Sequence, residues 1–333
     1  MFRTGKHAST FVLIALLALL VAACSETGGA ERVEESGSQG AVAQADTPAF
    51  NVAMVTHAPQ GDTFFDIIRA GADDAAQKDN ITYEYSNNAE PSQQANLIQN
   101  AIDRGVDGLA VSMPNPQALT APIQRAVEAG IPVVMFNAGF DTWQETGALM
   151  YFGQDESLAG QAAAERLNEA GAQKVLCVPQ EQGQAQLEAR CDGVQQNVDG
   201  EYEKLYVEGT NMPSVQSTIS SKLRQDPSID YVLTLGAPFA LAAVSALEEA
   251  GSEAQVVTFD TNAELVASIE SGDVQWAVDQ QPYMQGYQAI DGLWYYLNNR
   301  NVLGGGQAVL TGPSFIDQEN IAEVAELARQ GTR

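Results

Sequence analysis

Apolar and polar residues alternate along most of this chain in two recurring patterns. Short apolar runs bounded by turn residues are typical of buried strands, and longer amphipathic stretches are typical of helices. From Phe50 onward the two patterns succeed each other with little interruption, and Gly or Pro stands where helices end or begin, as at Pro91, Gly105, Pro116 and Gly130. A succession of this kind predicts parallel sheets covered by helices.

The predicted elements fall into two series. The first predicts strands at 51–56, 81–86, 107–112 and 132–136, and helices at 63–78, 91–104 and 116–130. After a loop at 137–149 and a short strand at 150–152, the second predicts helices at 157–170, 184–197, 214–224, 239–250 and 263–271, and strands at 174–178, 202–207, 229–235, 255–259 and 274–279. A long helix at 282–299, a glycine-rich turn, a strand at 307–310 and a helix at 317–329 end the chain. The fold class predicted is α/β, with two doubly wound parallel-sheet domains and a cleft between them, where ligands prefer to bind.

The loop after the first predicted strand is the first candidate for ligand contact. In a parallel α/β sheet, ligands bind at loops that leave the carboxyl ends of strands. Asp62 or Thr63 can cap the helix that follows this loop, and Phe64 and Phe65 begin that helix. Taken alone, this Phe pair also fits the start of a helix that packs on the core.

Length and composition place the chain among globular proteins and disfavour nucleic acid as a partner. The chain has 333 residues, enough for two domains, with 45% hydrophobic and 18% charged residues. Its formal net charge is −27, so it would repel the phosphate backbone of nucleic acids.

Motifs of the common catalytic sites are missing from the sequence. It contains no G-x-x-x-x-G-K-[ST] phosphate loop, no G-x-S-x-G nucleophile elbow and no His/Cys cluster with metal-ligand spacing. His57 is the single histidine after the N-terminal segment, so a Ser-His-Asp triad would need it. We therefore expect no enzyme activity, no cofactor and no metal, although an extracellular hydrolase stays as a less favoured alternative.

The N-terminus has the features of an export signal. Residues 1–24 join a basic start to an apolar run from Phe11 to Ala23 that is short for a membrane span. The run ends in Leu-Val-Ala-Ala-Cys, which resembles a bacterial lipobox and implies cleavage before Cys24 and lipidation of Cys24. A plain signal peptide with a chance cysteine is the alternative. Residues 25–48 are rich in Gly, Ser, Ala, Gln and Glu, and predict a flexible tether.

Two further cysteines, Cys177 and Cys191, lie in the body of the chain. Export allows them to oxidise. The first lies near the end of a predicted strand and the second in the next helix, so a disulfide between them is the favoured prediction and two free thiols the alternative.

Seven stretches in order resemble the type I periplasmic binding proteins of bacterial ABC transporters, closest to the ribose-binding-like, simple-sugar branch. They are THAPQGDTFFDIIRAG, GVDGLAVSMPNPQAL, AGIPVVMFNAGF, FGQDESLAGQAAAERL, EARCDG, VVTFDTNAE and DQQPYMQGYQAIDG. The resemblance implies two Rossmann-like lobes joined by a three-segment hinge, an N-terminal lobe of residues 49–153 plus 281–311 and a C-terminal lobe of residues 154–280 plus 312–333. The ligand would lie between the lobes, which close on it like a clam.

The resemblance also implies a set of ligand-binding residues. Position by position, these are Asp62, Phe64, Phe65, Asn137, Arg190, Phe259, Asp260 and Gln280. Planar polar groups of this kind suit the vicinal hydroxyls of a sugar, and an aromatic ring suits its C–H face. In this scheme Arg190 and Asp260 balance each other's charge.

Two departures argue against ribose itself as the ligand. Ala138 stands where ribose binders carry Arg, and Gly236 stands where they carry Asn. Trp143 and Phe239 are possible extra contacts. The resemblance implies a monomeric, lipid-anchored extracytoplasmic receptor that hands a monosaccharide or sugar-like polyol to an ABC permease. A sensory protein of the same fold that signals to a membrane receptor is the alternative.

Overall fold

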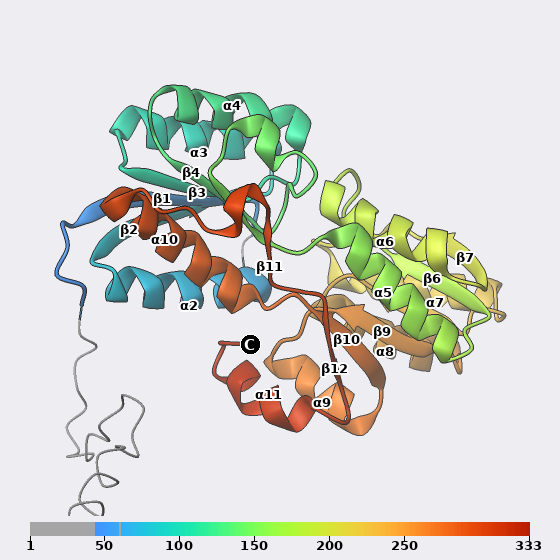
Figure 1. The fold of residues 1–333 in the computed structure, drawn as a ribbon. Coiled ribbons are helices and arrows are strands. Elements are labelled where there is room, and N and C mark those ends of the chain that lie inside the picture. Colours follow the sequence, from blue (N-terminus) through green and yellow to red (C-terminus); the bar gives the residue numbers. More distant parts are fainter. Residues whose placement is uncertain (1–43, 60) are drawn as a thin grey trace, which may run out of the picture. The chain divides into compact units, whose positions relative to one another are not determined.

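The first of two six-stranded sheets is entirely parallel (Figure 1). The computed structural model describes residues 44–59 and 61–333. The strand order is β11-β5-β4-β3-β1-β2. Its strands are β1 (Phe50–Thr56), β2 (Ile81–Asn87), β3 (Gly108–Val111), β4 (Val133–Phe136), β5 (Met150–Gly153) and β11 (Val309–Leu310). Its helices are α2 (Thr63–Lys78), α3 (Pro91–Arg104), α4 (Pro116–Glu128), η1 (Trp143–Thr146), α10 (Pro282–Asn299) and η2 (Gly304–Gly306). We call this sheet with its helices the first lobe.

The second sheet has the order β12-β10-β9-β8-β6-β7, with the edge strand β12 antiparallel to β10. Its strands are β6 (Lys174–Val178), β7 (Glu201–Lys204), β8 (Tyr231–Thr234), β9 (Gln255–Phe259), β10 (Val274–Asp279) and β12 (Ser314–Asp317). Its helices are α5 (Glu156–Glu169), α6 (Ala185–Asn197), α7 (Met212–Gln225), α8 (Ala237–Ala250), α9 (Ala263–Ser271) and α11 (Ile321–Arg329). This sheet with its helices is the second lobe. The predicted fold class, two α/β lobes with doubly wound sheets, is confirmed.

Each sheet is covered on both faces by apolar side chains. Along β1, Val52 and Met54 pack with α2 and α10, whereas Ala53 and Val55 pack with α3 and α4. Successive side chains of a strand point to opposite faces, so one strand serves two core layers. In the second lobe α5 and α6 cover one face, and α7, α8, α9 and α11 cover the other.

The chain passes from one sheet to the other three times. The passages lie between β5 and α5, between β10 and α10, and between β11 and β12. They connect the lobes through three neighbouring segments, while the residue-level lobe boundaries given above stay a prediction.

The C-terminal segment differs from its prediction. The helix predicted at 317–329 begins at Ile321, and Ser314–Asp317 forms the unpredicted strand β12. Asn320 closes a turn between them, because its side chain accepts a hydrogen bond from the Asp317 N–H at 3.0 Å and donates one to the Phe315 carbonyl at 2.8 Å. This turn occupies the residues that would otherwise start the helix.

The disulfide predicted between Cys177 and Cys191 is present and joins β6 to α6. Both cysteines are fully buried. The predicted signal peptide, the lipidated Cys24 and most of the predicted tether lie outside the described residues. At the end of that tether, Ala45 and Thr47 hydrogen-bond to the first lobe. Within 44–59 and 61–333, no helix is both long and apolar enough to cross a membrane.

Glycines allow one helix pair in each lobe to approach closely. A Cβ atom on Gly286 of α10 would lie 1.8 Å from the Ile68 carbonyl oxygen of α2, and one on Gly71 would lie 2.0 Å from the Tyr283 oxygen. In the second lobe, a Cβ on Gly160 of α5 would lie 2.3 Å from the Arg190 oxygen of α6. The helix that carries Arg190 is thus fixed by backbone contact with α5.

We expect Gly286→Ala to lower the free energy of unfolding by about 1–3 kcal/mol, the usual cost of overpacking a core. The added methyl group must push α10 away from α2. Urea denaturation of the variant measures the loss. Asn298→Ala, at an exposed position of the same helix, is the control and should change stability little. A Gly286→Ala variant as stable as this control would contradict the close helix contact.

Candidate functional site

A cavity of about 530 Å³ lies between the two lobes, at the carboxyl ends of their strands. The first lobe contributes the loop from β1 to α2 and Asn137, which follows β4. The second lobe contributes residues after β6, β8, β9 and β10. This is the edge at which parallel α/β sheets bind ligands.

The loop after β1 supplies an aromatic and acidic wall. Asp62 caps α2, since its Oδ1 accepts hydrogen bonds from the N–H groups of Phe64 at 2.8 Å and Phe65 at 3.3 Å. Burial raises the pKa of the Asp62 carboxyl, although these two bonds oppose the shift. Phe64 is partly exposed, whereas Phe65 is buried and packs edge-on against Phe64 and against His57. Phe64 therefore offers the accessible ring.

His57 connects the two lobes as a neutral group. Burial lowers its pKa to about 3. Its Nε2 lies 3.3 Å from the side-chain amide nitrogen of Gln186 in the second lobe, and its Nδ1 lies 2.8 Å from the Ser112 hydroxyl. Because the amide nitrogen can only donate, Nε2 accepts and Nδ1 carries the proton.

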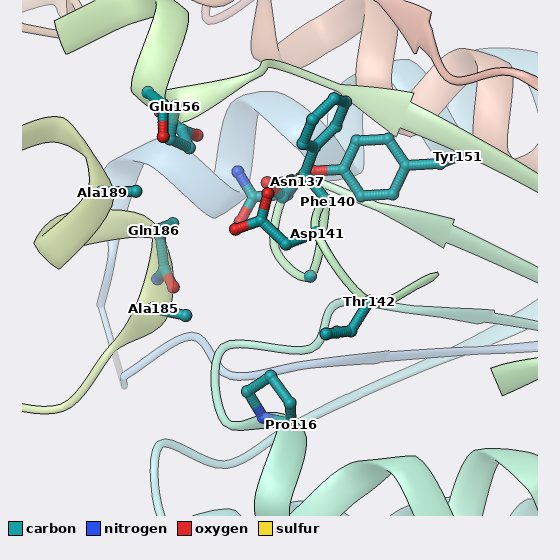
Figure 2. A pocket seen from close by; sticks show the side chains of 12 residues that line it. Pro116, Asn137, Phe140, Asp141, Thr142, Tyr151, Glu156, Ala185, Gln186 and Ala189 are labelled. Carbon is teal, nitrogen blue, oxygen red and sulfur yellow. Dashed lines mark hydrogen bonds between the residues drawn. The ribbon is translucent and has the colours of Figure 1, made fainter. Parts of the chain in front are cut away.

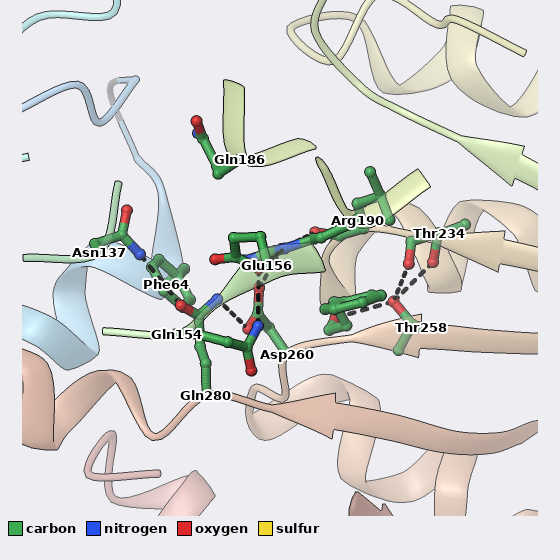
Figure 3. A network of polar contacts seen from close by, with 12 residues as sticks. Phe64, Asn137, Gln154, Glu156, Gln186, Arg190, Thr234, Thr258, Asp260 and Gln280 are labelled. Atoms are coloured by element: carbon green, nitrogen blue, oxygen red, sulfur yellow. Dashed lines mark hydrogen bonds and ion pairs between the residues drawn. The ribbon is translucent and has the colours of Figure 1, made fainter. Parts of the chain in front are cut away.

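Arg190 is held by a carboxylate that the sequence did not single out. Its Nε and Nη2 donate to Glu156 at 2.6 and 3.0 Å (Figure 3). Its Nη1 donates to the Leu235 carbonyl at 3.3 Å. Asp260, the expected partner, lies farther away, with Oδ2 3.8 Å from Nη1. Both side chains of the Arg190–Glu156 pair are at least 95% buried. The charge of Arg190 is therefore balanced by Glu156 first and by Asp260 second.

Asp260 and Gln280 lie at the ends of β9 and β10 and are joined to the first lobe. Gln280 donates from Nε2 to Asp260 Oδ1 at 2.8 Å, and its Oε1 accepts from Asn137 Nδ2 at 3.3 Å (Figure 3). Burial raises the pKa of Asp260 to about 7, and the nearby Arg190 and Gln280 only partly offset this effect. Asn137 and Asp260 both have a φ of 63°, a left-handed conformation that is uncommon outside glycine. Each lobe thus places one such residue directly after a strand and in the cavity wall.

Seven of the eight predicted ligand-binding residues line this cavity, namely Asp62, Phe64, Phe65, Asn137, Arg190, Asp260 and Gln280. Phe259 does not. It is fully buried, and its ring centre lies 4.6 Å below the Arg190 guanidinium, so it supports Arg190 from the core side. Of the two possible extra contacts, Phe239 lines the cavity beside Gly236, whereas Trp143 is buried against Tyr151 in the first-lobe core.

A second cavity of about 210 Å³ shares Asn137 and Gln186 with the larger one. Figure 2 shows Asp141 and Asn137 on its first-lobe side and Glu156 and Gln186 on its second-lobe side. Sequence reasoning missed His57, Glu156, Glu181 and Gln186 as parts of these walls. Among residues 44–59 and 61–333, no cluster of three or more His, Cys, Asp or Glu side chains could hold a metal ion.

Comparisons with known proteins agree on one family. Residues 52–301 match the model of the periplasmic binding protein domain. The xylose/arabinose-binding protein XylF of Sulfolobus acidocaldarius is 26% identical over 294 residues, a match that covers 82% of this chain and 72% of that protein.

Two solved structures are also similar to this chain. A carbohydrate transporter from Acidothermus cellulolyticus 11B, crystallised in complex with myo-inositol, is 57% identical with a TM-score of 0.85, and the match covers 86% of this chain and 100% of that one. An ABC transporter solute-binding protein from Burkholderia graminis, in complex with D-arabinose, is 23% identical with a TM-score of 0.74, covering 82% of this chain and 96% of that one. The second likeness shows the fold alone.

Proposed function

Because this chain belongs to the periplasmic binding protein family, as the match over residues 52–301 shows, we propose that it is an extracytoplasmic receptor for a ring-shaped polyol. The ligand is a monosaccharide or a cyclitol, and the receptor delivers it to an ABC permease. The relative that is 57% identical was crystallised with myo-inositol, which makes a cyclitol the first ligand to test.

The observation that carries this proposal is the make-up of the 530 Å³ cavity. Phe64 offers an aromatic ring to this cavity, and the side chains of Asn137, Asp260 and Gln280 offer hydrogen-bonding groups to it. A ring polyol has an apolar C–H face and a rim of hydroxyls, which match these two kinds of wall. Both lobes contribute, so the ligand is bound best when they are close together, and its binding favours closure.

Other parts of the proposal concern the rest of the protein. The relatives are binding proteins, and we propose that this chain likewise performs no catalysis. A signal peptide at 1–24, lipidation at Cys24 and a tether at 25–48 would hold it at the outer face of the cell membrane, as a monomer. Lobes of residues 49–153 with 281–311 and of residues 154–280 with 312–333 would move about the three connecting segments.

We expect calorimetry with a panel of myo-inositol, D-xylose, L-arabinose, D-ribose and D-glucose to find at least one compound that binds one-to-one without turnover. At a ligand concentration of 100 times Kd, the bound protein should be about 2.7 kcal/mol more stable than the free protein, and its thermal midpoint should rise. Mass spectrometry after incubation checks that the ligand is unchanged. Product formation, or no binding to any member of this panel, would contradict the proposed function.

A further inference from the structure

The larger cavity has more carboxylates than cations. Its described lining residues include Asp62, Glu181 and Asp260 but a single cation, Arg190, which already pairs with Glu156 at 2.6 and 3.0 Å. His57 contributes no positive charge, because burial keeps its pKa near 3. The described lining therefore carries negative charge that its own side chains leave unbalanced.

Two of these carboxylates come from opposite lobes. Asp62 caps α2 of the first lobe, and Glu181 lies between β6 and α6 of the second. Burial raises the pKa of the Glu181 carboxyl, and the charge of Asp62 adds to this shift. Asp62 is partly compensated by the N-terminus of α2, whereas Glu181 binds the neutral side-chain amide of Gln184. Bringing the lobes together thus brings two like charges together.

A buried acceptor at the same cavity also lacks a donor. Gln186 is 7% exposed and lines the cavity. Its Nε2 is committed to Gln184 Oε1 at 2.6 Å and to His57 at 3.3 Å, while its Oε1 has no hydrogen-bond partner. A buried acceptor left without a donor costs about 1–3 kcal/mol, and because this oxygen is itself covered, a donor on a ligand reaches it only after the Gln186 side chain turns.

We propose that the cavity accepts polyols that carry a protonated amino group, amino sugars or aminocyclitols, with the ammonium placed between Asp62 and Glu181. An ammonium has three donors and no acceptor, and its bonds to carboxylates are charge-assisted. It would relieve the repulsion between Asp62 and Glu181 and so favour closure of the lobes. The inference rests on the proposed function and names a substrate class for the same site.

The test is calorimetry on the full chain at pH 6.5 and low salt with matched pairs of compounds. The pairs are scyllo-inosamine with scyllo-inositol, D-glucosamine with D-glucose, and D-galactosamine with D-galactose. In at least one pair we expect the amino compound to bind about tenfold more tightly, which corresponds to about 1.4 kcal/mol. D-glucuronate is expected to bind more weakly than D-glucose, a measurement that needs no variant.

Two variants locate the ammonium. Glu181→Gln should abolish most of the tenfold advantage of the amino compound. Glu188→Gln makes the same change of charge on α6 at a residue that does not line the cavity, and should preserve the advantage. If the neutral polyols bind and no amino compound binds more tightly than its neutral partner, this inference is wrong and the proposed function stands. If the tighter binding of the amino compound survives Glu181→Gln, this inference is also wrong. Failure of every neutral and amino compound to bind would instead count against the proposed function.

Discussion

Glu156→Ala is expected to lower the free energy of unfolding by about 3–5 kcal/mol, because it leaves a buried guanidinium without its partner. Arg190 has 3% of its side chain exposed and gives two of its three nitrogens to Glu156. Asp260 cannot take over both bonds, since it lies 3.8 Å away and already accepts from Gln280. Urea denaturation at pH 7 measures the loss.

A matched control lies on α6, two residues before Arg190. Glu188 pairs with Lys204 at 2.9 Å, but their side chains are 27% and 18% exposed, so Glu188→Ala should cost less than about 1 kcal/mol. The double variant Glu156→Leu with Arg190→Leu should recover part of the stability lost in Glu156→Ala, because it removes both buried charges. Equal losses for Glu156→Ala and Glu188→Ala would show that the buried pair is not important for stability.

The fold was predictable because its signals are local and repeated. Gly105 adopts the left-handed conformation that ends α3, and Pro91 and Pro116 begin α3 and α4, as their positions in the sequence suggest. The strand β12 was missed because it is four residues long and depends on pairing with β10, far away in the sequence. A short edge strand of this kind is determined by tertiary contact rather than by its own pattern.

The site was predictable where chemistry follows directly after a strand. Asn137, Asp260 and Gln280 each occupy such a position, and all three line the cavity. Phe259 and Asp260 are consecutive, and consecutive side chains at a strand end point in different directions, so both could not face the ligand. Phe259 consequently packs beneath Arg190.

Glu156 could not be recognised from the sequence for a different reason. It is the first residue of α5, where an acidic side chain is common because it favours the helix N-terminus. Its partner Arg190 lies 34 residues later on another helix. Only the close approach of α5 and α6 at Gly160 and Gly193 brings the two side chains together.

Asp260→Asn is expected to weaken binding of the polyol ligand about ten- to a hundredfold. A hydrogen bond to a charged group contributes about 1.5–3 kcal/mol, and the amide replaces one carboxylate acceptor with a donor. Asn suits this test better than Ala, because Asp260 has a φ of 63°, the conformation that Asn137 also adopts. Calorimetry at pH 8, where the Asp260 carboxyl is ionised, with the compound that wild type binds best measures the effect, and unchanged affinity would remove Asp260 from the site.

With no ligand present at pH 8, the same Asp260→Asn variant should have a higher free energy of unfolding than wild type. Burial raises the pKa of Asp260 from 3.8 to about 7, so its contribution to stability is present below pH 4 and lost as the pH rises through 7. At about 1.4 kcal/mol per pH unit, the ionised carboxylate costs up to about 4 kcal/mol at pH 8, and the neutral amide avoids this cost. The difference in unfolding free energy should shrink as the pH falls toward 4. If the variant is less stable than wild type at pH 8, Arg190 and Gln280 fully compensate the buried charge of Asp260. If the variant is more stable but binds the ligand more weakly, the carboxylate is retained for binding at a cost in stability.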